Sequence, residues 1–243
     1  MYIVTSVGGG GRTYHNDMTL WDGVAEPVED AQELLAGVAD ESAVSALNDA
    51  RQTWWKDFWS ASYVDLGTED ENLSKVQKYY YGAQYLLGSS TKEGEVAPGI
   101  YALWHTTDSG WWNSDYHLNY NFMSAFYGTN TSNRTELSLP GIKALLEFVP
   151  EGQKRAGSID ELKRIKSDFV EAKIAKGDID PEKGIENALL YPVGIGPWGM
   201  TLDNNYHNEA LNASYNSYLF TQYYDYTMDD EFLANDMLSL IHI

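Results

Sequence analysis

Hydrogen-bonding and apolar side chains alternate strictly along a stretch in the middle of the chain. On an extended backbone, successive side chains point to opposite faces, so this pattern puts the polar groups on one face with the apolar groups beneath. A carboxamide both donates and accepts hydrogen bonds, which suits the hydroxyl groups of a sugar. The pattern predicts a strand with Asp115, His117, Asn119 and Asn121 on its polar face and Tyr116, Leu118, Tyr120 and Phe122 on its apolar face.

Tryptophans lie near this stretch and in a second loop. Trp104, Trp111 and Trp112 come directly before it, and exposed apolar clusters usually mark binding surfaces. We therefore predict a binding groove, with the tryptophans along its side (the aromatic wall) and the polar face of the strand at its base. An ordinary edge strand with a solvated face would show the same alternation. Trp198 stands among the glycines and prolines of 191–203, which cannot form a regular helix. It either protrudes as a ligand contact or caps the core.

Other familiar motifs are incomplete. The tetraglycine Gly8–Gly11 lacks the Lys and Ser/Thr of a phosphate-binding loop and indicates a turn. The acidic residues of 178–184 resemble a calcium loop, but Pro181 interrupts them, which favours a solvated loop. The five histidines form no i, i+4 metal-binding pair, and no Gly-x-Ser-x-Gly nucleophile elbow is present. The sequence thus implies neither a metal nor another cofactor.

Composition excludes several classes of function. The 243 residues carry a net charge of −20, which argues against binding a nucleic-acid backbone or an anionic membrane surface. No apolar run reaches the roughly 18 to 20 residues of a membrane helix. The absence of cysteine excludes disulfides and thiolate chemistry. Eight Trp and 18 Tyr remain the outstanding feature, and such rings suit a flat, neutral ligand such as a sugar.

Helices must position these residues. Apolar residues recur at helical spacing in several segments, and capping boxes at Thr68/Glu71 and Ser158/Glu161 mark two helix starts. Helices are predicted over 29–60, 68–88, 158–175 and 205–226, with a last one beginning near Glu231. Long loops, 89–117 and 191–205, separate them and are typical of functional segments. Helices that alternate with long aromatic loops are typical of an array of α/α hairpins.

The two ends look cut. Residues 1–7 alternate like a strand but have no neighbouring strand to pair with, and the last helix stops without a cap. No signal peptide is visible. We expect a fragment whose first strand belongs to a missing sheet.

Several of these segments together resemble glycoside hydrolase family 95. The resemblance rests on Trp54-Trp-Lys-Asp-Phe-Trp59, the Tyr-rich 77–87, Pro98-Gly-Ile-Tyr-Ala-Leu-Trp104 and Asp115-Tyr-His-Leu-Asn-Tyr-Asn121. That family belongs to the six-hairpin glycosidases. The resemblance implies a mainly α chain holding a partial (α/α)₆ toroid. Residues 1–28 would be the tail of an N-terminal β-sandwich domain, 29–66 a helical linker, and 67–243 the N-terminal part of the catalytic domain.

The resemblance also implies a reaction: hydrolysis of α-linked sugars with inversion, with α-L-fucosides or α-L-galactosides as substrates. In the family, two asparagines that match Asn119 and Asn121 orient the catalytic water beside an Asp base, and a Glu acts as the acid. That acid and base lie further along than this chain extends, so it is expected to turn over little alone. The substrate would be an oligo- or polysaccharide, and the location secreted, periplasmic or cell-surface. Expected substrate contacts are Trp104, Trp111, Trp112, Asp115, His117 and Trp198.

Alternatives remain open at this stage. The residues after Asn121, Phe-Met-Ser-Ala-Phe-Tyr, differ from the family's common Thr-Glu-Met-Asn-Tyr-Trp, so another six-hairpin specificity stays possible. A complete enzyme would draw its acid and base, about 6.5 to 9.5 Å apart for inversion, from Asp108, Asp115, Glu136, Asp203 and Glu209. A non-catalytic carbohydrate-binding domain would instead place no carboxylate near Asn119 or Asn121. A polysaccharide lyase is disfavoured, because few cations lie near the loops.

Overall fold

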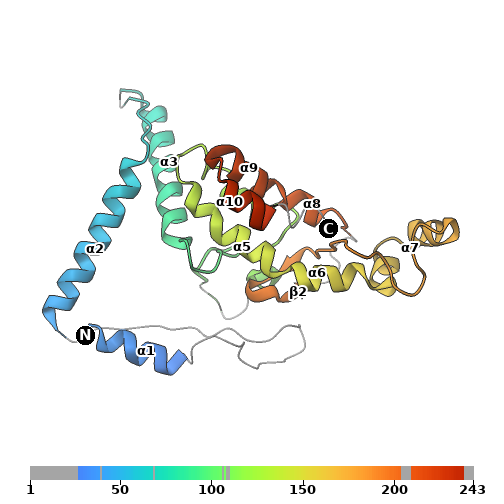
Figure 1. Ribbon diagram of the computed structural model, residues 1–243. Helices are drawn as coiled ribbons and strands as arrows, with labels where there is room; N and C mark the ends of the chain where they lie inside the picture. The colour runs from blue at the N-terminus through green and yellow to red at the C-terminus, as the bar shows by residue number, and fades with distance from the viewer. Residues whose placement is uncertain are drawn as a thin grey trace. The chain divides into compact units, whose positions relative to one another are not determined.

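The computed structural model describes residues 27–237 apart from 39, 68, 106, 108, 109 and 204–208. The described part is mainly helical, as predicted (Figure 1). The chain divides into two compact units, Met1–Asp65 and Leu66–Ile243. The predicted strand at 1–7 and the tetraglycine Gly8–Gly11 lie outside the described residues.

The first unit contains two helices, α1 (Pro27–Ala36) and α2 (Glu41–Ser60). The helical segment predicted over 29–60 consists of two helices, because a new helix starts at Glu41. The Asp40 side chain accepts a hydrogen bond of 2.9 Å from the backbone N–H of Ala43. An aspartate in this position satisfies one of the unpaired N–H groups at a helix start, which favours separate helices over one continuous one.

The second unit opens with α3 (Glu71–Ser90), which ends close to its predicted end. Its cap is Asp70, whose carboxylate accepts from the N–H groups of Asn72 at 2.7 Å and Leu73 at 3.2 Å. The prediction of Thr68 as the capping residue is therefore wrong. Two candidate caps stand close together in the sequence, and the aspartate accepts both hydrogen bonds.

Short helices and one small hairpin make up the rest of this unit. In order they are η1 (Trp111–Ser114), α4 (Asn121–Phe126), η2 (Thr135–Ser138), α5 (Leu139–Glu147), α6 (Val149–Ala156), α7 (Ile159–Lys176), β1 (Gly194–Ile195), η3 (Pro197–Gly199), β2 (Thr201–Asp203), α8 (Asn212–Asn216), α9 (Tyr218–Thr227), α10 (Asp230–Phe232) and η5 (Leu233–Met237). Strands β1 and β2 are antiparallel. Of the helix predicted over 205–226, residues 205–208 lie outside the described residues, 209–211 are not helical, α8 begins at Asn212, and the helix breaks at Ser217. The last helix starts near Glu231 as predicted, capped by Asp229.

The core of this unit lies where α5 meets α9 and η3, with α10 close by (Figure 1). Its members are apolar residues from α4, α5, α9, α10 and the segments around 116–118 and 191–195. Those with almost no exposed surface include Leu118, Phe122, Met123, Phe126, Phe148, Ile195 and Leu219. Tyr116, Leu118 and Phe122 of the stretch that begins at Asp115 thus enter the core and anchor that stretch to the helices.

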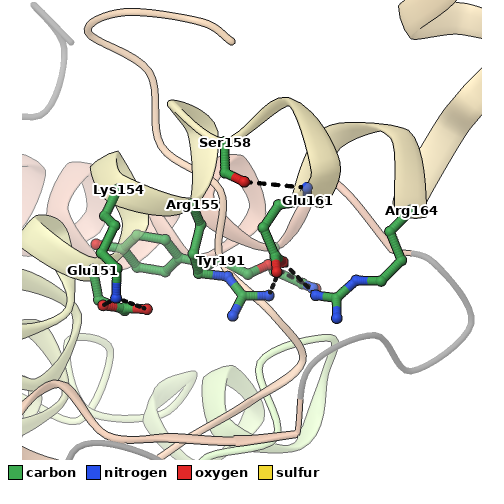
Figure 2. Close-up of polar contacts among 8 residues, drawn as sticks. Glu151, Lys154, Arg155, Ser158, Glu161, Arg164 and Tyr191 are labelled. Atoms are coloured by element: carbon green, nitrogen blue, oxygen red, sulfur yellow. Dashed lines mark hydrogen bonds and ion pairs between the residues drawn. The ribbon is translucent and has the colours of Figure 1, made fainter. Parts of the chain in front are cut away.

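The junction between α6 and α7 is held by charged and capping side chains (Figure 2). Ser158 accepts from the N–H of Glu161, so the predicted cap is confirmed. The Glu161 carboxylate contacts the buried Arg155 at 3.2 Å and also pairs with the more exposed Arg164. Gly177 ends α7 in the left-handed conformation at φ 78°, which glycine adopts without steric cost. Here the local signals of the sequence were sufficient.

Two buried tyrosines should make the protein sensitive to alkali. Burial raises the pKa of the Tyr191 hydroxyl, and burial together with the carboxylate of Glu147 raises the pKa of Tyr116. The stability from such a group is complete below the unfolded-state pKa of about 10 and is lost as the pH rises above it. We therefore expect the melting temperature to fall steeply above about pH 10, measured by thermal unfolding at increasing pH.

The matched variant is Tyr191→Phe. Its loss of the 2.7 Å hydrogen bond to the carbonyl of Leu145 lowers stability at neutral pH. Because phenylalanine does not ionise, the alkaline fall should become shallower. A fall of unchanged steepness in this variant would contradict the assignment to Tyr191.

Candidate functional site

The stretch that begins at Asp115 is extended only in its first half. The N–H of Tyr116 donates to the carbonyl of Ile195 at 2.9 Å, and the N–H of Leu118 donates to that of Val193 at 2.7 Å. The chain then turns, and α4 starts at Asn121. The predicted strand is therefore wrong beyond Leu118, because helix formation by the following apolar residues ends the alternation.

Asp115 and His117 form a buried pair, with exposed fractions of 2% and 6%. One oxygen of Asp115 accepts from the backbone N–H of His117 at 3.0 Å and from its ring Nδ1 at 2.9 Å. Because an ionised carboxylate can only accept, the ring nitrogen Nδ1 donates this hydrogen bond. The Trp112 ring lies 5.9 Å from the imidazole, centroid to centroid. The pair fixes the orientation of the imidazole beneath an aromatic side chain.

Asn119 and Asn121 lie at the turn that follows this pair. Asn119 is half-buried, and its Nδ2 donates to Oε1 of Glu209 at 3.3 Å. Asn121 is exposed in the first turn of α4. Tyr120, predicted to point into the core, is instead 58% exposed because the turn rotates it outward. The structure thus brings a carboxylate from a distant segment to the first of the two asparagines.

The tryptophans before the stretch are exposed, as the aromatic wall requires. Trp111 is 74% and Trp112 48% exposed, and their rings lie 5.9 Å apart, edge to face. Trp112 and Asn113 have positive φ angles of 51° and 55°, a backbone strain that often accompanies binding sites. Trp104 is also exposed, in the loop ahead of η1.

Trp198 is held against α5. Its backbone N–H donates to Oε2 of Glu147 at 2.9 Å, and its φ angle is 57°. A β-carbon at the next residue, Gly199, would lie 2.8 Å from the carbonyl oxygen of Glu147, so the loop needs glycine there. The Trp198 side chain is half-buried. It therefore neither protrudes fully, as a ligand contact would, nor lies fully in the core.

Two further groups of polar residues join distant segments of this unit and were not among the predicted site residues. Asn216 of α8, only 1% exposed, donates from Nδ2 to the carbonyls of Leu118 at 2.7 Å and Asn212 at 2.8 Å. The hydroxyl of Tyr127 pairs with that of Tyr215, and this hydrogen bond raises the pKa of Tyr127. A buried asparagine and a tyrosine pair between distant segments leave no periodic signal in the sequence.

The remaining acidic candidates are dispersed. Glu136 is exposed in η2, while Asp108 and the side chain of Asp203 lie outside the described residues. The predicted solvated loop contains a turn in which Asp180 accepts from the N–H groups of Glu182 and Lys183. Among the described residues, no group of three His, Asp or Glu side chains could hold a metal ion.

The lengths and compositions of the helices bear on membrane insertion. In the described part of the chain, none of them is long and apolar enough to cross a bilayer.

The sequence matches a known enzyme family. The family model of the glycosyl hydrolase family 95 catalytic domain covers residues 46–242, which is most of the chain and contains all of the candidate residues above. A search of the curated proteins finds no match. With its mainly helical fold and this match, the chain belongs to glycosyl hydrolase family 95, as its sequence motifs predicted.

Proposed function

We propose that this chain carries the water-positioning part of an α-glycosidase that acts with inversion. Family membership implies a glycoside hydrolase and a carbohydrate substrate. The observation that carries the finer proposal is the carboxamide of Asn119, half-buried beside a carboxylate and close in sequence to exposed tryptophans. Asn119 and Asn121 would hold the attacking water, and Trp111 and Trp112 would contact the sugar. We propose α-L-fucosides or α-L-galactosides as substrates and a secreted, periplasmic or cell-surface location.

The position of the carboxylate favours an enzyme over a binding domain. If the chain were only a carbohydrate-binding module, no carboxylate would be expected beside Asn119 or Asn121. In the structure, Oε1 of Glu209 lies 3.3 Å from Nδ2 of Asn119. Two neutral carboxamides can orient a water without adding a charge that would perturb the pKa of a nearby acid. An inverting mechanism needs such a water on the face opposite the leaving group.

Hydrolysis with a stereochemical readout tests this function. The protein translated from the full reading frame that contains these residues is incubated with aryl α-L-fucoside and aryl α-L-galactoside, and ¹H NMR follows the first anomer released. Inversion predicts the β-anomer before mutarotation. Initial release of the α-anomer would contradict inversion. Sugar binding without hydrolysis of either substrate would favour the binding-domain alternative.

Removing the most exposed tryptophan should weaken sugar binding. Trp111→Ala is expected to raise the Kd of the 243-residue chain for L-fucose roughly tenfold, about 1.4 kcal/mol, because a stacking surface is lost. The measurement is a titration followed by NMR. The matched control is Tyr79→Ala on α3, since Tyr79 is 79% exposed, about as much as Trp111. Equal effects of both variants would show that Trp111 is not a specific contact.

A further inference from the structure

The backbone on the N-terminal side of Asn119 is fixed from two sides. The N–H of Leu118 donates to the carbonyl of Val193, and the carbonyl of Leu118 accepts from Nδ2 of Asn216, both at 2.7 Å. Leu118 itself has no exposed surface. The backbone that leads into Asn119 is therefore held in place, and the side chain of Asn119 needs a contact of its own.

One short segment makes contact with both Leu118 and Asn119. Glu209 reaches the side chain of Asn119, and Asn216, in α8 of the same segment, reaches the carbonyl of Leu118. Asn212, between them, donates to the carbonyl of Tyr191 at 3.4 Å. Two contacts hold the segment 209–216 against the turn and a third holds it to Tyr191, so the carboxylate of Glu209 has a defined position rather than that of a surface side chain.

A carboxylate in this position can distinguish the two ends of a carboxamide. An ionised carboxylate only accepts hydrogen bonds, so it binds the NH₂ end of Asn119 and repels the oxygen end. With Nδ2 directed at Glu209, Oδ1 faces the other side and can accept a hydrogen bond from a water molecule. A water that donates to Oδ1 keeps an oxygen lone pair for attack on a sugar carbon. The opposite orientation would present NH₂ to the water and occupy one of the two lone pairs of its oxygen.

From this geometry we propose that Glu209 is a positioning residue that fixes the orientation of the Asn119 carboxamide. Its place in catalysis rests on the proposed function, whereas the contact between the two residues does not. Glu209 acts through Asn119 and transfers no proton. What matters at position 209 is an oxygen that accepts the hydrogen bond from Asn119, which either a carboxylate or a carboxamide can supply. The ability to release a proton is not needed.

The carboxamide signals of Asn119 in ¹⁵N-labelled chain give a direct test. They are assigned by their loss in Asn119→Asp. Glu209→Ala should shift both amide proton signals, whereas Glu209→Gln should largely preserve them, since its Oε1 accepts the same hydrogen bond. The charge-matched control is Glu231→Gln, because Glu231 is exposed on α10, and it should leave them unchanged. Unshifted Asn119 signals in Glu209→Ala would overturn the inference.

Kinetics separate this inference from the proposed function. If Asn119→Ala leaves kcat of the full-reading-frame protein unchanged while Glu209→Ala still shifts the Asn119 signals, the water-positioning role fails and the contact stands. In hydrolysis by the full-reading-frame protein, Glu209→Ala should lower kcat by about 10- to 100-fold with little change in KM. Glu209→Gln should recover most of that loss. A Gln variant as impaired as the Ala variant would identify a proton-transfer role and overturn the positioning role.

Discussion

Replacing Asn119 with alanine is expected to lower kcat for aryl α-glycoside hydrolysis by about 10²- to 10³-fold, with KM nearly unchanged. In the proposed mechanism this carboxamide contacts the attacking water and not the sugar. Its removal leaves substrate binding intact and the water unoriented, so the loss falls on the chemical step. Initial rates over a range of substrate concentrations, with the full-reading-frame protein, separate the two constants.

The matched control for this variant is Asn72→Ala. Asn72 is an exposed asparagine in the first turn of α3, as Asn121 is in the first turn of α4. It removes the same chemical group at a similar backbone position, so kcat should stay within error of the unmodified protein. Asn121→Ala should resemble Asn119→Ala. A kcat within twofold of the unmodified protein for both site variants would rule out the asparagine pair as the water-positioning groups.

Replacing Glu161 with alanine is expected to destabilise the protein by about 3 kcal/mol, near the low end for a buried ion pair that loses one member. Arg155 is only 6% exposed, and its guanidinium lies 3.2 Å from the Glu161 carboxylate (Figure 2). Without that carboxylate the arginine must remain buried with its charge less well compensated. The Glu161 side chain is itself 27% exposed to solvent, which keeps the loss of stability from being larger. Urea unfolding followed by circular dichroism measures the change.

Two further variants identify the cause. Arg164 pairs with the same carboxylate but is 41% exposed at its side chain, so Arg164→Ala should cost less than about 1 kcal/mol. The double variant Arg155→Met with Glu161→Leu removes both charges and should recover most of the stability, because no buried charge remains. If Arg164→Ala were as damaging as Glu161→Ala, the surface pair rather than Arg155 would carry the effect.

Helix ends were predicted well where a single polar residue decides them. Ser158 and Gly177 bound α7 as expected, since a hydroxyl that accepts from an N–H and a glycine at positive φ act within one helical turn. The start of α3 moved from Thr68 to Asp70, where two capping residues compete. The helical segment predicted over 29–60 contains two helices, and the long helix predicted over 205–226 is interrupted at Ser217. Helical spacing alone does not show where an internal cap or break will form.

The alternation from Asp115 shows the limit of a periodic pattern. It correctly predicted an extended start with Tyr116 and Leu118 buried, yet Phe122 is buried from a helix and Tyr120 points to solvent. The same apolar residues can be buried by a strand that continues to the end of the stretch or by a strand that gives way to a turn and a helix. The backbone hydrogen bonds to Val193 and Ile195 end at Leu118. The alternation of side chains could not show how far along the stretch the segment 193–195 would pair with it.

By itself the sequence determined the mainly helical class and the enzyme family and supplied candidate residues for binding a sugar, because composition, helical spacing and motif order do not depend on tertiary contacts. Only the tertiary structure decided how those residues are held. Asn119 meets Glu209 across 90 positions, and Leu118 meets Asn216 across 98. Contacts over such separations depend on how the core packs α8 and α9 against the turn. Burial of apolar surface is non-directional, so no local pattern in the chain specifies which polar groups it brings together.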